Sequence, residues 1–273
     1  MRGRCPGIVA VLVILIAIAA GTPAAWADDS ADAGQQVVAA YTTVKGSVRP
    51  DPGVSVAASK KKLYDMAESY IWAAIPPDCR PLVSRLELFA TQTSAEDAVD
   101  GTATPNDDGS RWTLSFDWGE AESAVVERNA DDEAVFDEVI AHELGHILSL
   151  KSDQFTDDDS RGTYSDSDGT FRKSAYLNAF YQDFWKDRYP GWTDKDGDQE
   201  QAAALYGAHA QAFVTEYAAT DPSEDFAESF ASFVLQTKPI AATERSKKIR
   251  FFYAYPELVK DRDFLRQNLD SAN

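Results

Sequence analysis

The sequence predicts an α+β fold in which a small mixed sheet precedes a mainly helical C-terminal part. Apolar residues alternate over 82–90 and again over 111–118, which is typical of half-buried strands. From about residue 131 onward, the apolar residues follow helical spacing instead. This order, with strands first and helices later, favours an α+β arrangement over a regular alternation of strand and helix.

The first 27 residues are typical of an export signal. Arg2 and Arg4 precede an apolar core over 8–20, and Ala25-Trp26-Ala27 matches a small-x-small cleavage site. We therefore expect a secreted protein whose mature chain begins at Asp28. The alternative is an uncleaved signal that remains as a membrane anchor.

The net charge argues against two classes of binding partner, and the cysteine content argues against an internal disulfide. The net charge is −19, and removal of residues 1–27, which contain two arginines and no acidic residue, leaves −21. Such a charge argues against nucleic acid or an anionic membrane as partner of the mature chain. Cys79 is the only cysteine after residue 27, so we expect no internal disulfide.

The composition predicts a flexible leader or linker over 28–55 and one domain over 56–273. We expect this domain to act as a monomer.

Periodicity and breaker residues predict the elements in order. We expect a helix over 60–75, ended by Pro76-Pro77, then the two strands with a loop or hairpin end over 100–110 between them. A helix follows from about Asp131 or Asp132 to Leu150, and then a polar surface loop over 151–170. Further helices are predicted at about 171–187, 199–218, 223–237 and 243–268.

The helix that ends at Leu150 carries the strongest chemical signal. His142-Glu143-Leu144-Gly145-His146 matches the H-E-x-x-H pattern. Histidines four residues apart project from one face of a helix, so both imidazoles can reach one metal ion. Zinc lowers the pKa of bound water towards about 7, and Glu143 is placed to accept its proton.

The alternative is that both histidines are ordinary polar residues of an amphipathic helix. Gly145 argues against this reading, because glycine inside a helix costs about 1 kcal/mol relative to alanine. A close approach of another element at Gly145 would explain its presence.

A catalytic zinc usually has three protein ligands and a water, so a third ligand is needed. The third histidine of a metzincin pattern would fall at position 152, which is Ser152, so that class is excluded. His209, the remaining histidine, lies in an Ala-rich predicted helix. Asp166 follows Gly162-Thr163 one residue out of register with an aspzincin pattern. Both remain weaker candidates.

The predicted helix over 223–237 offers a better ligand. Glu224 and Glu228 lie at the edge of its apolar face, and carboxylates near a core must be paired, hydrogen-bonded or bound to metal. A rival interpretation makes Asp221 the N-cap and Glu224 the partner residue of a capping box. The capping box leaves Glu228 unexplained, so we favour a metal ligand at Glu224.

These residues resemble the gluzincin metallopeptidases of the anthrax toxin lethal factor type. The similarity lies in the H-E-x-x-H helix, in Glu224-Asp225-Phe226-Ala227-Glu228-Ser229-Phe230, and in a tyrosine, Tyr217, seven residues before Glu224. It covers about 133–150 and 215–235. The resemblance implies a zincin-like catalytic domain with Glu224 as third zinc ligand, Glu228 as a supporting group and Tyr217 as the hydroxyl that stabilises the oxyanion.

The sequence therefore predicts a secreted zinc metalloendopeptidase, which hydrolyses peptide bonds by glutamate-assisted attack of zinc-bound water on a protein or peptide substrate. Strand 111–118 is the predicted edge along which an extended substrate would lie. The rival is a non-catalytic exported binding protein with a structural zinc site.

A second metal is suggested by the acidic run Asp194, Asp196 and Asp198, which resembles the start of a calcium loop. The run departs from the EF-hand pattern at Gln199 and Leu205. A non-EF calcium site and a solvated acidic turn both remain open.

Overall fold

The computed structural model describes residues 35–44, 46–91, 100–158, 162–189, 192 and 199–270. The strands within these ranges are β1 (Gln35–Val44), β2 (Ser47–Pro50), β3 (Val83–Thr91), β4 (Gly101–Pro105) and β5 (Trp112–Asp117). The α-helices are α1 (Lys61–Ala74), α2 (Trp118–Ala121), α3 (Ala130–Leu150), α4 (Tyr176–Phe184), α5 (Gln199–His209), α6 (Pro222–Leu235), α7 (Glu244–Phe251) and α8 (Pro256–Asn268). The predicted signal over 1–27 and the acidic run Asp194, Asp196 and Asp198 lie outside the described residues.

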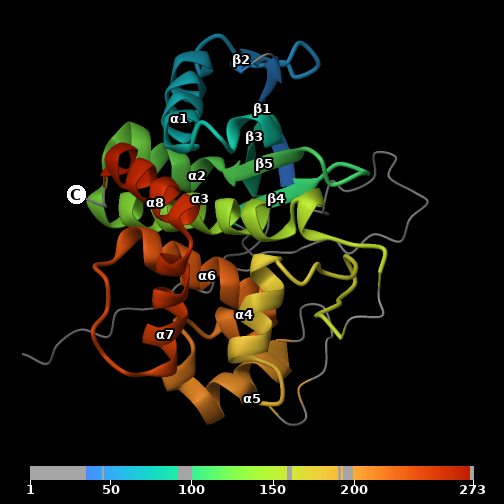
Figure 1. The fold of residues 1–273 in the computed structure, drawn as a ribbon. Coiled ribbons are helices and arrows are strands. Elements are labelled where there is room, and N and C mark those ends of the chain that lie inside the picture. The colour runs from blue at the N-terminus through green and yellow to red at the C-terminus, as the bar shows by residue number, and fades with distance from the viewer. Residues whose placement is uncertain are drawn as a thin grey trace, which may run out of the picture.

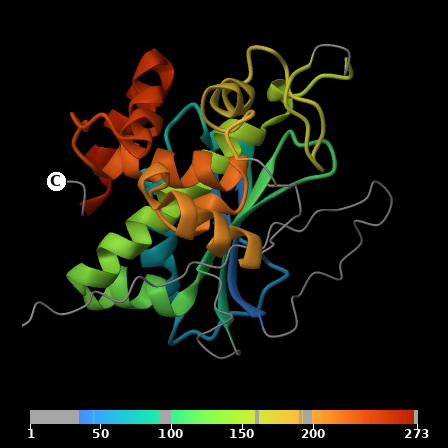
Figure 2. The same ribbon diagram turned by 90° about the horizontal axis from the view of Figure 1, so that it is seen from below.

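The α+β class is confirmed. The described strands form one mixed sheet in the order β2-β1-β3-β5-β4, with β3 and β5 parallel and the other pairs antiparallel. Helix α3 crosses the middle of the molecule between this sheet and helices α4, α5, α6 and α7 (Figure 1). Seen from below, those helices lie in front of α3 with the sheet behind it (Figure 2).

The flexible leader predicted over 28–55 is wrong for the described residues in that range. Residues 35–44 form β1, which pairs with both β2 and β3, and Ala39, Ala40 and Tyr41 are buried. Valine, threonine and tyrosine dominate the second half of β1, and such side chains favour the pleated, half-buried surface of a sheet. The strand was missed because the segment as a whole is rich in Ala, Asp and Ser, a composition typical of a flexible leader.

The predicted edge strand is also wrong. Residues 112–117 form β5, which lies between β3 and β4, so β5 is an interior strand. The edge on this side of the sheet is formed by β4, inside the segment predicted as a loop or hairpin end. The turn that joins β4 to β5 contains Gly109 at φ 64°, a conformation that glycine adopts at little cost. Glycine, proline and aspartate around β4 concealed its short run of strand.

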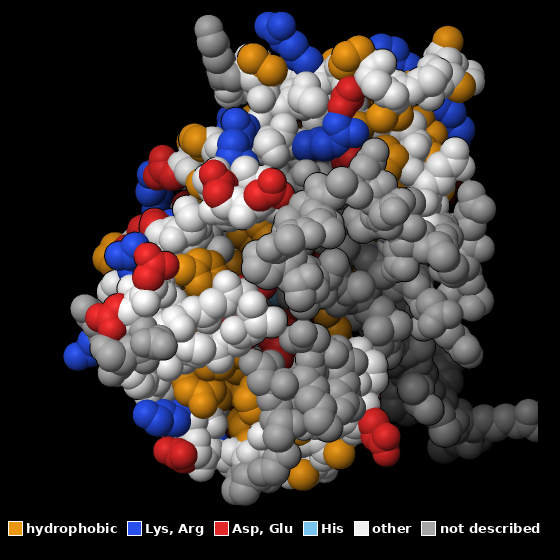
Figure 3. Space-filling model, turned by 90° about the vertical axis from the view of Figure 1, so that its right-hand side faces the viewer, with side chains coloured by type: hydrophobic (Ala, Val, Ile, Leu, Met, Phe, Trp, Pro, Cys, Tyr) orange, Lys and Arg blue, Asp and Glu red, His pale blue; other side chains and the backbone are white. Residues whose placement is uncertain are grey.

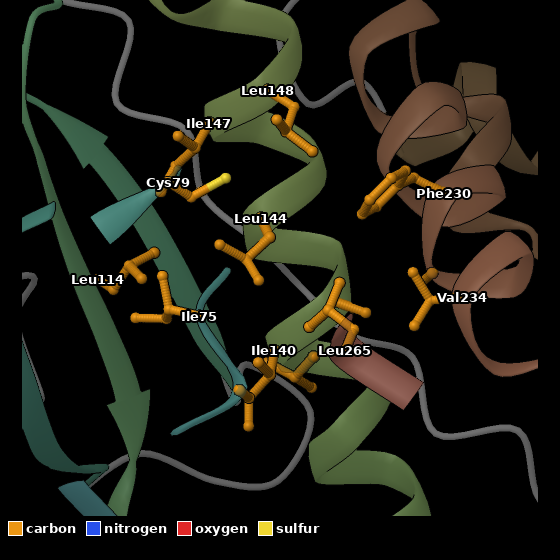
Figure 4. Packing of buried hydrophobic residues seen from close by; sticks show 14 of the residues in the cluster. Ile75, Cys79, Leu114, Ile140, Leu144, Ile147, Leu148, Phe230, Val234 and Leu265 are labelled. Carbon is orange, nitrogen blue, oxygen red and sulfur yellow. The ribbon is translucent and has the colours of Figure 1, made fainter. Parts of the chain in front are cut away.

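Helix α3 forms the centre of the hydrophobic core. Its N-terminus is capped by Asn129, whose side chain accepts a hydrogen bond from the amide of Asp131. Leu144 and Ile147 point towards the sheet side of the core, while Phe230 and Val234 of α6 lie on the opposite side of the helix (Figure 4). A buried leucine, isoleucine or phenylalanine contributes about 1.5–3 kcal/mol, so this packing fixes α3 between two layers.

Gly145 marks the point where α3 and α6 cross. A Cβ atom built on Gly145 would lie 2.9 Å from Ala227 Cα and 3.3 Å from Ala227 Cβ. The close approach expected at Gly145 is therefore present, and it brings the face of α3 that carries the histidines against α6.

We expect Gly145→Ala to destabilise the fold by about 1–3 kcal/mol, because the added methyl must push the two helices apart. Gly207→Ala is the matched control, since its Cβ would have no atom within 4 Å and alanine favours helix by up to about 1 kcal/mol. Urea unfolding of both variants measures the difference. Equal stabilities would contradict the close crossing.

The C-terminal helices are shorter than their predicted ranges. The single helix predicted over 243–268 is two helices, since α7 ends at Phe251 and Pro256 starts α8. Proline has no backbone N–H and is tolerated at the first helical position, which explains the break. The helix predicted over 199–218 ends at His209, and short 3-10 turns follow over 210–212 and 217–219. Within the described residues, no helix is both long enough and apolar enough to cross a membrane.

Candidate metal centre

Three side chains from α3 and α6 meet at one buried point. His142 Nε2 lies 2.9 Å from His146 Nε2, and Glu224 Oε2 lies 3.2 Å from the first and 3.4 Å from the second. All three residues are at most 2% exposed. This group could hold a metal ion.

The spacing of the three donor atoms fits a small tetrahedral ion. Metal–ligand bonds of about 2.0–2.1 Å at tetrahedral angles place neighbouring donors about 3.3 Å apart. The three separations in the protein, 2.9, 3.2 and 3.4 Å, bracket that value. Two imidazoles and one carboxylate are also a donor set that zinc accepts.

The outer nitrogens of both histidines have their own partners. His142 Nδ1 lies 2.8 Å from Glu228 Oε1, and Glu228 Oε2 accepts a hydrogen bond from Thr215 Oγ1 at 2.7 Å. His146 Nδ1 lies 3.3 Å from Ser223 Oγ. A carboxylate can only accept from His142 Nδ1, so this contact places the ring proton on Nδ1 and leaves a lone pair on Nε2.

The charges around the converging donors favour a positive charge between them. Burial by itself would lower the pKa of His142, but the carboxylates of Glu224 and Glu228 outweigh burial and raise that pKa well above its usual range. Burial would likewise raise the pKa of Glu224, yet His146 and His142 hold it at about 2. These surroundings thus favour an ionised Glu224 carboxylate next to a positive charge. A divalent metal ion would supply that positive charge.

Asp221, and not Glu224, caps α6. The Asp221 carboxylate accepts hydrogen bonds from the amides of Ser223 and Glu224 at 2.7 and 2.9 Å. Pro222 occupies the first turn, as predicted. The Glu224 side chain is thereby left to face the histidines, so the capping-box interpretation of Glu224 is wrong.

Glu143 is a buried carboxylate beside this group. It is 0% exposed, and neither of its oxygens has a partner among the described residues. Burial raises the pKa of Glu143 to about 7. Leaving a buried polar group unpaired costs about 1–3 kcal/mol or more, and such a cost is typical of functional sites.

Gly101 allows the edge strand to approach this carboxylate. A Cβ on Gly101 would lie 2.6 Å from Val139 Cγ1 and 3.3 Å from Glu143 Oε1. Any larger residue would therefore separate β4 from α3. The absence of a side chain places the edge of the sheet directly beside Glu143.

Tyr217 lies next to the metal ligands on a separate segment. Its ring centroid is 6.2 Å from that of His142, and the residue is 7% exposed. Burial, together with the carboxylates of Glu224 and Asp221, raises the pKa of Tyr217 well above its usual value. The hydroxyl therefore keeps its proton at neutral pH.

The two weaker ligand candidates lie outside the group. His209 is exposed and packs against the ring of Tyr189 at a centroid distance of 5.3 Å. Asp166 uses Oδ1 to accept from the amides of Asp168 and Gly169 in its own loop. Neither belongs to the buried group that could hold a metal.

Four residues around the site escaped prediction. Thr215 and Ser223 orient Glu228 and His146, Gly101 admits β4, and Glu138 is a further acid near Glu228 whose pKa burial raises to about 7. Glu138 precedes His142 by four residues, and this spacing puts it on the helix face that carries the histidines. The sequence therefore contained a signal for Glu138. The other three carry no comparable signal, because their roles depend on how separate elements pack.

A buried ion pair supports the back of α6. Asp225 Oδ2 lies 2.5 Å from Lys248 Nζ on α7 and accepts a hydrogen bond from Trp185 Nε1 at 2.7 Å. Lys248 and Asp225 are both 0% exposed, and the Lys248 ammonium lies 3.8 Å from the ring centroid of Phe213. Asp225 follows Glu224 directly, so these contacts fix the rotation of α6 that turns Glu224 towards α3. Breaking such a pair typically costs about 3–5 kcal/mol.

Figure 3 shows acidic side chains recessed near the middle of one face, at about the height at which α3 crosses the molecule in Figure 1.

We expect Glu228→Gln to weaken metal binding by about 10–100-fold, because supporting carboxylates hold the tautomer and basicity of a ligating histidine. Glu216→Gln is the control, since Glu216 is an exposed acid next to Thr215, in the segment that precedes α6. Competition with a chromogenic chelator measures both affinities. Unchanged affinity in Glu228→Gln would refute its supporting role.

Comparison of the chain with protein-family models, with curated proteins and with solved structures gives no match in any of the three.

Proposed function

We propose that this protein is a zinc-dependent peptidase with a zincin-like catalytic domain, built as the gluzincin resemblance implies. The observation that carries the proposal is the combination of two features at one place. Three buried donors have the spacing of a tetrahedral zinc site. Glu143, a buried carboxylate with no hydrogen-bond partner among the residues that the structure describes, lies beside them. A structural zinc site is closed by protein ligands and holds no water whose proton such a carboxylate could accept.

The number of donors also supports catalysis. A structural zinc is closed by four protein ligands, whereas a catalytic zinc has three and keeps one position open. The described residues contribute His142, His146 and Glu224 to the group. The rival function, a binding protein with a structural zinc, would need a fourth ligand.

In the proposed reaction, zinc supplies Lewis acidity, polarising the substrate carbonyl and lowering the pKa of water. Glu143 accepts the proton of the attacking water and passes it to the departing amine. Tyr217 donates its hydroxyl proton in a hydrogen bond to the oxyanion that develops on the substrate. Glu228 holds the His142 imidazole in the tautomer that leaves the Nε2 lone pair free for a metal. Ser223 Oγ, beside His146 Nδ1, helps to orient the second imidazole.

The edge strand β4 suits an extended peptide substrate. Gly101, at the start of β4, lies against Glu143, so a chain paired with β4 would pass the general base. Added strands are a common form of peptide recognition because main-chain hydrogen bonds hold any sequence in register. This proposal moves the substrate from β5, the predicted edge, to β4. Secretion remains part of the proposal and rests on the signal predicted over 1–27.

The decisive experiment measures metal content and peptide hydrolysis on the same samples of purified mature chain. One zinc per chain, with cleavage of a mixed peptide library that stops on chelation and returns on addition of zinc, is the expected result. Zinc that binds without any cleavage would favour the binding-protein function. No bound zinc would contradict the metal site itself.

A further inference from the structure

A second pocket lies at the opposite end of the sheet from the metal centre. It has a volume of about 430 Å³ and is lined by Thr43, Gly46, Pro77, Arg80, Pro81 and Arg111. The pocket adjoins the start of β5, where Trp112 pairs with Val83, whereas Gly101 at the metal centre pairs with Phe116. The four-residue separation along β5 corresponds to about 13 Å.

The two arginines of this pocket have no acidic partner among the described residues. This is unusual in a chain with 45 acidic and 26 basic residues. The nearest acids along the sequence are engaged elsewhere. Asp78 pairs with Lys260 at 2.5 Å, and Asp108 accepts from the amide of Ser110. Both guanidinium charges therefore lack a counter-charge from the described residues.

Neutral acceptors hold both guanidinium groups in place. Arg111 Nη2 donates to Thr43 Oγ1 at 2.8 Å and to Val83 O at 2.9 Å. Arg80 donates from Nε and Nη2 to the carbonyls of Ile75 and Trp72, and its guanidinium lies 5.2 Å from the ring centroid of Trp72. An arginine held in this way loses little side-chain entropy when it binds a ligand.

Donors remain unused on these fixed groups. Arginine has five N–H groups, and the contacts above use two from each side chain. Arg111 Nε is buried and has no hydrogen-bond partner among the residues that the structure describes. A buried donor of this kind is costly unless an acceptor satisfies it, so an oxyanion that reaches Arg111 would offset that cost.

We propose that this pocket binds an oxyanion, a carboxylate or phosphate group, between Arg80 and Arg111. Guanidinium groups bind both through paired N–H···O bonds. The rings of Pro77 and Pro81 give the pocket rigid apolar walls, and its volume admits a small molecule or the acidic end of a larger one. This binding site is separate from the metal centre and does not depend on the proposed peptidase activity.

The test uses inorganic phosphate and succinate as probes on the full mature chain, at constant ionic strength. The readout is the ¹⁵N-resolved Nε–H resonance of Arg111, supported by the melting temperature. We expect a saturable shift that is about 10–100-fold weaker in affinity in Arg80→Gln. In Arg111→Gln we expect loss of the ligand-induced rise in melting temperature. Arg49→Gln, an exposed arginine of the neighbouring strand β2, controls for net charge and should bind as the native chain does.

A second pair of variants keeps the test valid where an arginine variant fails to fold. Gly46 has φ 77° and no atom within 4 Å of an added Cβ, and both Asp and Asn tolerate that conformation. Gly46→Asp places a competing carboxylate at the pocket and should abolish the shift, whereas Gly46→Asn should retain it. Saturation by succinate alone identifies a carboxylate ligand, and saturation by phosphate alone identifies a phosphate ligand. No saturable shift, or equal binding in all variants, would overturn the proposal.

Discussion

Glu143→Gln should retain the metal and lose peptide hydrolysis by about 10²–10⁴-fold, the contribution typical of a general base. Glutamine preserves the shape of the side chain but cannot accept the proton of the attacking water. Because Glu143 is buried and its oxygens have no hydrogen-bond partner within the described part of the chain, exchanging it for a neutral amide also removes the cost of an isolated carboxylate. We therefore expect a melting temperature equal to or above that of the native chain.

This combination of outcomes separates catalysis from folding. The measurements are zinc stoichiometry, melting temperature and kcat/KM on one cleavable peptide. Glu120→Gln serves as the control, because burial also raises the pKa of Glu120 although it lies outside the metal-binding group. Full activity of Glu143→Gln with zinc bound would rule out Glu143 as the base.

Sequence periodicity predicted the relative positions of residues well where one helix carries the information. The i, i+4 spacing of His142 and His146 predicted their shared face. The glycine between them predicted a close approach of another element, which is α6 in the structure. Position along a helix is a local property, so a local pattern suffices. The same reasoning placed Glu224 and Glu228 at the edge of a buried face, where the structure has them at 2% exposure.

Pairing between distant segments was the part that sequence patterns could not supply. β4 has only five residues and lies among turn formers, so its strand state depends on hydrogen bonds to β5. The position of β5 inside the sheet depends in turn on that partner. Strand order is a property of the whole sheet, and for this reason the edge position was assigned to the wrong strand.

The ambiguity at Glu224 was of a different kind. Asp221 at the N-cap and Glu224 three residues later satisfy the spacing of a capping box as well as that of a ligand on a buried face. Only the packing of α6 on α3 decides between them, because it brings two imidazoles within 3.4 Å of the Glu224 carboxylate.

Glu224→Ala should remove the metal site. With two ligands left, we expect a loss of zinc affinity well beyond the about 10–100-fold typical of a supporting group, and loss of hydrolysis with it. Asp221 still caps α6 in this variant, since its bonds go to backbone amides. The fold should therefore survive, and far-ultraviolet circular dichroism of the metal-free forms should match that of the native chain.

The controls for Glu224→Ala are the two ligand candidates that lie elsewhere, His209→Ala and Asp166→Ala. Both should bind one zinc per chain with native affinity, because neither side chain belongs to the group of converging donors. Chelator competition on the three variants and the native chain orders their affinities directly. If zinc is retained in Glu224→Ala but lost in one of the controls, the residue changed in that control is the third ligand. Zinc lost in Glu224→Ala alone, with the fold intact, would establish that α3 and α6 together hold the metal.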